Sequence, residues 1–412
     1  MQKIAKPILR APLLPLLISA QVAIAFAICV SSAYVLTKQV TPILTKDGVR
    51  SPDTLVIASY LVPRGKPWPA SRLHEVESSV AGVAGLRATS VATSVPFEIG
   101  SEMSADVAQL SGQSKTNATI YVGDALVGTL GLQLIAGRDF SPDERDQLLS
   151  GVGFGVSGPV ILSHQLAEKL FPNGSALGSL VRIGDDNVSG VRRVVGVVQN
   201  LVSNDLGPGA DSKLEEAMIF PGIPSEWPLP VYIARVDQPS DVGGVCRRIV
   251  DVLNDSFRGE LVQGIEPRCE TYSAMRERAL ASRHAAAWLL SGITGVVLLV
   301  ALMGVGGLTS YWVQLRRRQI GLRRALGATR ADILSLFLLE NALVVGIGIV
   351  AGGLVTYAGS TWITRHLSLE RTPFSYLLAG AVAMLIVCQL TALKSALQAS
   401  RVVPMAALRL VD

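Results

Sequence analysis

The sequence lacks the short motifs by which many enzymes bind phosphate groups or metal ions. No phosphate-binding GxxxxGK[ST] segment occurs, since the one Gly-Lys pair, Gly65-Lys66, is followed by Pro67. Neither HExxH nor paired CxxC is present, and the histidines are too scattered to hold a metal: His74, His164, His284 and His366. We therefore expect no catalytic residue, no bound cofactor and no metal site, in a protein that is not itself an enzyme.

Charged residues are also scarce, and they are unevenly placed. They form 17% of the 412 residues against 49% hydrophobic residues, which is too apolar for an ordinary soluble protein. Residues 37–283 hold 28 of the 32 acidic residues but only 23 of the 37 basic ones. Because the remaining basic residues lie beside apolar runs, they indicate membrane flanks rather than a nucleic-acid surface.

Four apolar runs are each long enough to cross about 30 Å of hydrocarbon. We expect transmembrane helices at residues 13–36, 284–313, 333–358 and 374–394. A cleaved signal peptide is the alternative for the first run, because Ala25-Phe26-Ala27 is a possible cleavage site, but the run continues well past it. Glycine is dense in the second and third runs. There Gly348 and Gly352 form a GxxxG pair, which predicts helix packing against a partner that the sequence does not identify.

Lysine and arginine in the short flanking segments predict the orientation. They gather in residues 1–12, in the loop 314–332 and near the tail 395–412, whereas the loop 359–373 has only Arg365 and Arg371. Both termini and the arginine-rich loop are therefore expected in the cytoplasm, and residues 37–283 outside it. Glu340 lies near the start of the third run, where a carboxylate is either functional or paired with a neighbouring helix.

Residues 37–283 have the pattern of a mixed α/β domain. A strand-like Leu55–Val62, a helical pattern at 71–83 and a strand-like 88–95 form one unit. Strand-like Val231–Val236, a helix opened by Ser240 and strand-like LVQGI (261–265) form another. Residues of about 100–225 are richer in glycine, threonine and short β-like runs such as PVILS, with one helix capped by Ser163. This stretch predicts an inserted β-rich subdomain.

Two further features of the outer region link it to its surroundings. Cys246 and Cys269 are able to form a disulfide if this region is outside the cytoplasm, although two buried free thiols would give the same pattern. The stretch Tyr272–Trp288 contains no glycine or proline and runs into the second span. It predicts one continuous helix, with a short surface helix as the alternative.

The arginine-dense segment RRRQIGLRRALGATRADI, residues 316–333, separates the second and third runs. After Gly321 it places Leu322, Ala325, Leu326 and Ile333 on one side, with arginines opposite, and Gly327 permits a turn before the next span. Such an amphipathic segment is suited to the membrane interface. The alternative is a plain basic loop that follows the positive-inside rule.

This segment, followed by LLEN and GGL, resembles the FtsX-like permease family of ABC transporters, especially the macrolide-exporter (MacB) type. The tail ASRVVPMAALRL and the outer stretches LQLIAGRDFSPDE, PVILSHQLAEKLFP and VVGVVQN are similar to the same family. One position departs from it: Gln319 stands where the family commonly has glutamate. If that carboxylate pairs with an arginine, the contact here is neutral and weaker.

The resemblance implies a permease subunit of the bacterial inner membrane, with its large domain in the periplasm. It implies a homodimer, or a heterodimer with a related permease, on a cytoplasmic ABC ATPase that binds ATP and Mg, and also a periplasmic adaptor and an outer-membrane channel. Motion driven by ATP would pass to the outer domain (mechanotransmission) for efflux or extraction. The implied ATPase-docking residues are Gly321, Leu322, Arg323, Arg324, Ala325, Leu326, Gly327, Ala328, Thr329, Arg330 and Ile333.

Two other functions fit the same sequence. One is a non-transporting FtsX-like regulator that activates a periplasmic or cell-wall partner. The other is a membrane-anchored extracytoplasmic binding protein without an ATPase. An ATPase that associates with the chain would exclude the second of these, and the identity of the outer partner separates transport from regulation.

Overall fold

The computed structural model describes residues 13–98, 100–110, 114–145, 148–149, 157–185, 188–207, 213–225, 227–315, 329–367 and 371–400. The chain forms two compact units. One consists of Met1–Thr41 and Arg283–Asp412, and the other of Pro42–Ser282. The boundaries fall within helices α2 (Leu13–Leu44) and α8 (Tyr272–Leu315), so both helices contribute residues to both units.

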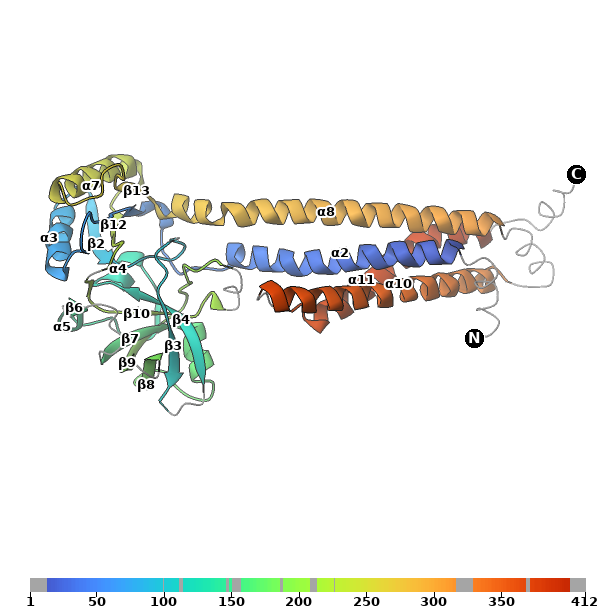
Figure 1. The fold of residues 1–412 in the computed structure, drawn as a ribbon, viewed down its shortest axis with the longest axis horizontal. Coiled ribbons are helices and arrows are strands. Elements are labelled where there is room, and N and C mark those ends of the chain that lie inside the picture. The colour runs from blue at the N-terminus through green and yellow to red at the C-terminus, as the bar shows by residue number, and fades with distance from the viewer. Residues whose placement is uncertain are drawn as a thin grey trace, which may run out of the picture. The chain divides into compact units, whose positions relative to one another are not determined.

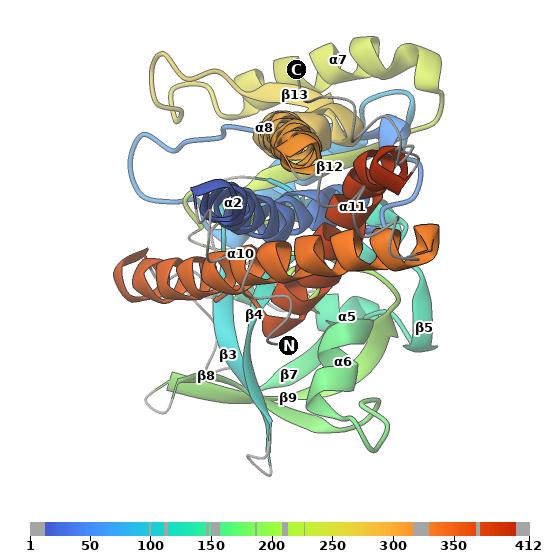
Figure 2. The ribbon, with the colours of Figure 1, turned by 90° about the vertical axis from the view of Figure 1, so that its right-hand side faces the viewer.

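The first unit is helical and contains α2, α8, α10 (Arg330–Leu367) and α11 (Phe374–Ser400) (Figure 1); Figure 2 shows α10 crossing α2. In each helix a stretch is long and apolar enough to cross a membrane: Pro15–Leu44, Tyr272–Tyr311, Ala331–Trp362 and Phe374–Leu393. All four predicted apolar runs are thus helical, and every helix continues beyond the predicted run. The buried apolar side chains between them come from all four helices, with Ile18, Val22, Phe26 and Val30 of α2 among them.

The second unit contains a four-stranded antiparallel sheet in the order β13-β1-β12-β2. Its strands are β1 (Leu55–Ser59), β2 (Leu86–Ala92), β12 (Val231–Val236) and β13 (Arg268–Thr271). Helices α3 (Ala70–Ala81) and α7 (Val242–Ser256) pack their apolar faces on this sheet. On α7 the buried side chains are those of Val245, Cys246, Ile249 and Leu253, which form one apolar stripe along the helix.

Two details of this part were predicted wrongly. Ser240 does not cap α7, because it lies in a 3-10 turn, Pro239–Asp241, that precedes the helix. The LVQGI stretch is not a strand: only Leu261 makes an isolated bridge, to Pro63, and Gly264 has a φ of 87°. Such a φ suits glycine in a turn and breaks an extended run. The third strand of that unit is instead β13, which ends directly before α8.

The strands that follow β2 and precede β12 in the sequence include seven that form a second sheet. Its strand order is β5-β9-β7-β10-β4-β3-β8. An additional pairing of β9 with β8 closes every strand except β5 into a ring. Such a ring leaves few unpaired edges. The strands are β3 (Ser104–Gln109), β4 (Lys115–Val122), β5 (Leu134–Gly137), β7 (Gly158–Ser163), β8 (Leu180–Asp185), β9 (Val188–Val198) and β10 (Ala217–Phe220).

Short elements complete this unit. Helix α6 (His164–Leu170) packs on the ring through Leu166 and Leu170, and the Ser163 hydroxyl accepts a hydrogen bond from the Leu166 amide, so the predicted cap is confirmed. The others described are a 3-10 turn at Pro52–Thr54, α4 (Leu126–Leu130), α5 (Pro142–Arg145) and a two-stranded parallel pair, β6 (Leu148–Leu149) with β11 (Ile223–Pro224).

Candidate functional site

The predicted ATPase-docking segment falls mostly outside the described residues. Gly321, Leu322, Arg323, Arg324, Ala325, Leu326, Gly327 and Ala328 belong to the interval 316–328, so their role stays a prediction. The structure describes the docking segment only from Thr329 onward, and Thr329 directly precedes α10. Thr329 and Asp332 cap this helix reciprocally: the Thr329 amide lies 3.0 Å from the Asp332 carboxylate, and the Asp332 amide 3.2 Å from the Thr329 hydroxyl. Ile333 is 4% exposed, so in this structure it packs within its own chain.

The GxxxG pair of α10 lies against α2, the partner that the sequence did not identify. A Cβ built on Gly348 would come within 2.7 Å of the Ser19 carbonyl oxygen, and one on Gly352 within 2.5 Å of the Ala23 carbonyl oxygen. No larger side chain fits at either position without moving a helix. The two glycines therefore set how closely α10 approaches α2.

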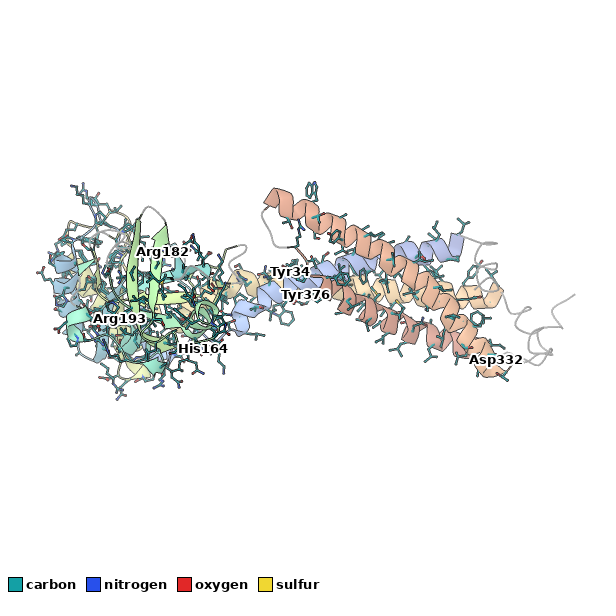
Figure 3. The ribbon with its side chains drawn as sticks, turned by 90° about the horizontal axis from the view of Figure 1, so that it is seen from below. Tyr34, His164, Arg182, Arg193, Asp332 and Tyr376 are labelled. Carbon is teal, nitrogen blue, oxygen red and sulfur yellow. A yellow bond between two sulfur atoms is a disulfide. The ribbon has the colours of Figure 1, made fainter. Side chains whose placement is uncertain are left out.

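Helices α8 and α11 also present a glycine to α2. A Cβ on Gly304 of α8 would meet the Gln21 side chain, and one on Gly380 of α11 would lie 2.5 Å from a methyl group of Val30. The rings of Tyr34 on α2 and Tyr376 on α11 pack edge to face, with centroids 5.4 Å apart (Figure 3). Each of the three other helices thus packs closely on α2, which lies at the centre of these contacts.

Polar side chains within the apolar helices add directional contacts. The Ser19 hydroxyl donates to the Val344 carbonyl (2.9 Å), the Gln21 amide to the Val300 carbonyl (3.0 Å) and the Gln389 amide to the Leu338 carbonyl (3.1 Å). Glu340 is 2% exposed and its neighbour Asn341 4%, so both are enclosed by the helices. Hydrogen bonds of this kind fix the register of helices where lipid offers no alternative partner.

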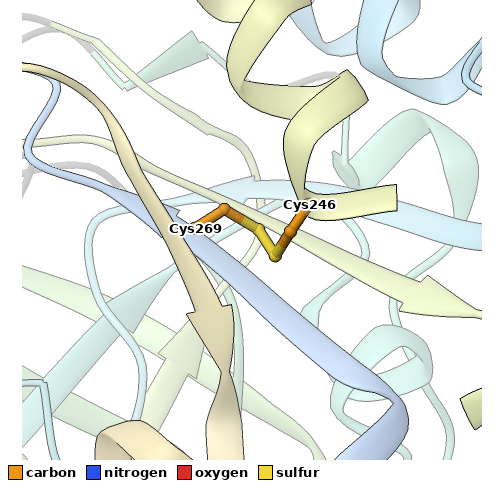
Figure 4. The surroundings of a disulfide bond; sticks show 2 residues. All are labelled: Cys246 and Cys269. Carbon is orange, nitrogen blue, oxygen red and sulfur yellow. A yellow bond between two sulfur atoms is a disulfide. The ribbon is translucent and has the colours of Figure 1, made fainter. Parts of the chain in front are cut away.

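A disulfide joins Cys246 of α7 to Cys269 of β13 (Figure 4). The two Cα atoms are 5.4 Å apart, within the range that such a bond requires. Residues in β13 pair with β1, and α8 begins at the residue that follows β13. The disulfide therefore ties the strand that leads into α8 to a helix of the outer domain.

A buried carboxyl group, Glu77 of α3, lies beside the half-buried Asp124, which precedes α4. Glu77 is 6% exposed, and burial, reinforced by the neighbouring Asp124 carboxylate, raises the pKa of Glu77 to about 8. Asp124 also accepts a hydrogen bond of 2.7 Å from the Ser90 hydroxyl. Among the described residues, no three His, Cys, Asp or Glu side chains are arranged to hold a metal ion.

Two family models match the chain. One, the FtsX-like permease C-terminal region, matches residues 291–404, and the other, the MacB-like periplasmic core domain, matches residues 22–234. The FtsX-like match contains the later part of α8 with α10 and α11, and the MacB-like match contains most of α2, β1, β2, the seven-stranded sheet and most of β12. Residues 235–290, with α7, β13 and the start of α8, lie in neither match. The second match alone covers more than half of the chain.

Individual relatives agree with these models. The chain is 25% identical over 264 residues to the uncharacterized ABC transporter permease YknZ of Bacillus subtilis, covering 61% of this chain and 59% of that protein. It is 28% identical over 284 residues to the macrolide export ATP-binding/permease protein MacB 1/2 of Paracoccus denitrificans, covering 66% of this chain and 39% of that protein. The chain thus spans less than two thirds of the length of either relative.

Solved structures of outer domains are also similar. The extracellular domain of the transporter YknZ aligns with a TM-score of 0.34 at 16% identity, over 52% of this chain and 98% of that one. The periplasmic region of MacB from Actinobacillus actinomycetemcomitans aligns with a TM-score of 0.37 at 13% identity, over 56% and 94%. Because both scores are below 0.5, the assignment of the family rests on the sequence matches.

Proposed function

This chain belongs to the FtsX-like permease family with a MacB-like periplasmic core domain, and we propose that it passes ATP-driven motion from a separate cytoplasmic ATPase to its extracytoplasmic domain. The motion would serve the export or extraction of a substrate. In this proposal the chain binds no cofactor itself, and ATP and Mg bind to the ATPase. It acts as a homodimer or as a heterodimer with a related permease.

The observation that carries the proposal is the length of α8. This helix runs without interruption from Tyr272 to Leu315, which is 44 residues. At 1.5 Å per residue it is about 66 Å long, roughly twice the thickness of the hydrocarbon layer. A single helix with no proline is stiff, so a displacement at its Leu315 end is passed to the Tyr272 end. There the helix follows β13, a strand of the four-stranded sheet.

The end at Leu315 leads directly into the arginine-dense segment, where we place the ATPase. Leu322, Ala325 and Leu326 would dock in the ATPase, and the surrounding arginines would hold the segment at the cytoplasmic face. This orientation puts both termini in the cytoplasm of a bacterial inner-membrane protein. The ring of strands between β2 and β12 would form an inserted subdomain, available to a periplasmic adaptor and an outer-membrane channel.

Substitution of one docking residue tests the proposal. We expect Leu326→Asp to abolish association with the ATPase, because the substitution places a charge in an apolar contact that excludes water. The tagged full chain is purified from its native host in mild detergent, the bound ABC ATPase is identified by mass spectrometry, and ATP hydrolysis is measured.

A matched control separates docking from insertion. Leu110→Asp makes the same substitution at a leucine that is 54% exposed in the outer domain, and it should leave the bound ATPase unchanged. Both variants should reach the membrane in wild-type amounts. Full recovery of the ATPase with Leu326→Asp would reject this docking surface, and absence of any ATPase from the wild-type preparation would reject the transporter function itself. A cell-wall hydrolase as the outer partner would indicate the regulator.

A further inference from the structure

Helix α2 contains a proline close to its end, at Pro42. In an α-helix the carbonyl of residue i−4 accepts a hydrogen bond from the amide of residue i, and proline has no amide hydrogen to donate. Pro42 therefore withholds the bond that the Lys38 carbonyl would otherwise receive from within the helix. A polar group in this position needs another donor, since an unsatisfied carbonyl near lipid is costly.

Arg283 of α8 supplies a donor to that carbonyl. Its guanidinium Nη1 lies 3.0 Å from the Lys38 carbonyl oxygen, and Arg283 is 8% exposed. Burial of an arginine is unusual unless its donors are engaged, and the planar guanidinium offers five of them. The position of Arg283 is thus matched to the hydrogen bond that Pro42 cannot make.

Arg276 makes equivalent contacts with the end of α2. Its Nη2 lies 3.2 Å from the Ile43 carbonyl oxygen and 3.4 Å from that of Thr45, and its Nε lies 3.2 Å from the Asp47 carboxylate. The last carbonyls of any helix lack intrahelical donors, and a cation suits the negative end of the helix dipole. The Tyr272 hydroxyl also donates to Asp47, at 3.1 Å.

These donors occupy one face of α8. At 100° per residue, Tyr272, Arg276 and Arg283 lie within about 40° of one another around the helix. The order of the contacts is antiparallel, since Arg276 meets Ile43 and Thr45 whereas Arg283 meets Lys38. Seven residues separate Arg276 from Arg283, a rise of about 10 Å along α8. Seven residues also separate Lys38 from Thr45, which directly follows the end of α2 at Leu44. The contacts therefore specify one register for the α2–α8 pair.

We propose that Arg283 is a positioning residue that replaces the hydrogen bond lost at Pro42 and, with Arg276, fastens α2 to α8 in this register. The use of this contact to transmit motion rests on the proposed function, whereas the contact itself does not. Pro42 and Arg283 act together: proline cannot donate to the Lys38 carbonyl from within the helix, and Arg283 of α8 donates to it instead.

A double-mutant cycle tests the dependence of Arg283 on Pro42. The four proteins are the wild-type full chain, Pro42→Ala, Arg283→Met and the double variant, each in lipid nanodiscs without ATPase. Hydrogen exchange is measured for peptides that cover residues 36–46. Methionine keeps much of the side-chain volume of arginine but none of its donors, and alanine restores the amide that donates to the Lys38 carbonyl.

With proline at position 42, Arg283→Met should raise exchange in this segment at least about tenfold, because local opening becomes easier. With alanine at position 42, the same substitution should raise it less than about threefold. Arg283→Lys retains a donor and should stay near the wild type. Arg278→Met is the control on another face of α8, where Arg278 pairs with Glu270 at 2.6 Å, and it should leave residues 36–46 unchanged.

Equal effects of Arg283→Met in the two backgrounds would overturn the proposal, because the arginine would then act independently of the proline. An effect of Arg278→Met as large as that of Arg283→Met would overturn it as well. Should Arg283→Met fail to insert while the double variant inserts, the rescue by alanine supports the proposal. The measurement needs no ATPase, so a failure of the docking experiment leaves its outcome unaffected.

Discussion

Removal of the disulfide between Cys246 and Cys269 should lower the free energy of unfolding of the outer domain by an amount that depends on the length of the loop it closes. The bond closes a loop with a sequence separation of 23 residues. In the chain-entropy description, a loop of this length removes about 11 cal/mol/K from the unfolded chain, or about 3.4 kcal/mol at 25 °C. We expect Cys246→Ser/Cys269→Ser to lose this stabilisation.

The expected change in melting temperature follows from the size of the unit. Residues Pro42–Ser282 form one compact unit. At about 2.1 cal/mol/K per residue, its entropy of unfolding is about 0.5 kcal/mol/K, so a loss of 3.4 kcal/mol lowers the melting temperature by about 7 °C. Reduction of the wild-type disulfide should have a similar effect, because it opens the same loop.

Differential scanning calorimetry of the full chain in detergent measures this change. The transition of the outer domain is compared for the wild type, the wild type with a phosphine reductant and the double serine variant. Cys29→Ser is the control, since Cys29 is a free cysteine in α2. A double variant that melts within about 2 °C of the wild type would refute the loop-closure argument. So would a reductant that lowers the melting temperature of the double variant as much as that of the wild type.

Two further predictions concern the helix contacts and the buried carboxyl group of Glu77. Gly352→Leu should destabilise the helical unit by about 1–3 kcal/mol, because its Cβ would lie 2.5 Å from the Ala23 carbonyl oxygen. Gly292→Leu should not, because a Cβ there would meet no other part of the described chain within 4 Å, and unfolding in mixed detergent compares the two variants. Glu77 keeps its proton to about pH 8 when folded but releases it near pH 4.3 when unfolded, so its contribution to the free energy of unfolding falls as pH rises between these values. Glu77→Gln should therefore gain stability relative to the wild type from pH 5 to pH 8 in thermal melts, and a constant difference would contradict the assignment.

Local patterns predicted much of the fold. The run PVILS becomes most of β7, and Ser163 caps the helix that follows it, because strand alternation and capping depend only on neighbouring residues. The glycine- and proline-free stretch from Tyr272 is indeed continuous with the second apolar run. The start of α7 was missed, since Pro239 favours a 3-10 turn that shifts the helix past Ser240.

Contacts between residues far apart in the chain could not be predicted from the sequence. The GxxxG pair predicted a close helix contact, but the glycines themselves carry no information about which helix approaches, and the partner is α2. The contact between Arg283 and the Lys38 carbonyl joins residues 245 positions apart. In the sequence, Pro42 signals this contact, because a proline within a helix cannot donate a hydrogen bond to the carbonyl four residues before it, here that of Lys38. The docking residues Gly321–Ala328 lie outside the described residues and stay a prediction.

Transmission of motion along α8 is the central claim, and hydrogen exchange of the chain in complex with its ATPase tests it most directly. Exchange is measured without nucleotide and after ATP, Mg and vanadate trap the closed ATPase. We predict altered exchange in α8 and in the outer domain, including β13 at the start of that helix. If the changes are confined to the ATPase and its immediate contacts, the chain does not transmit the motion.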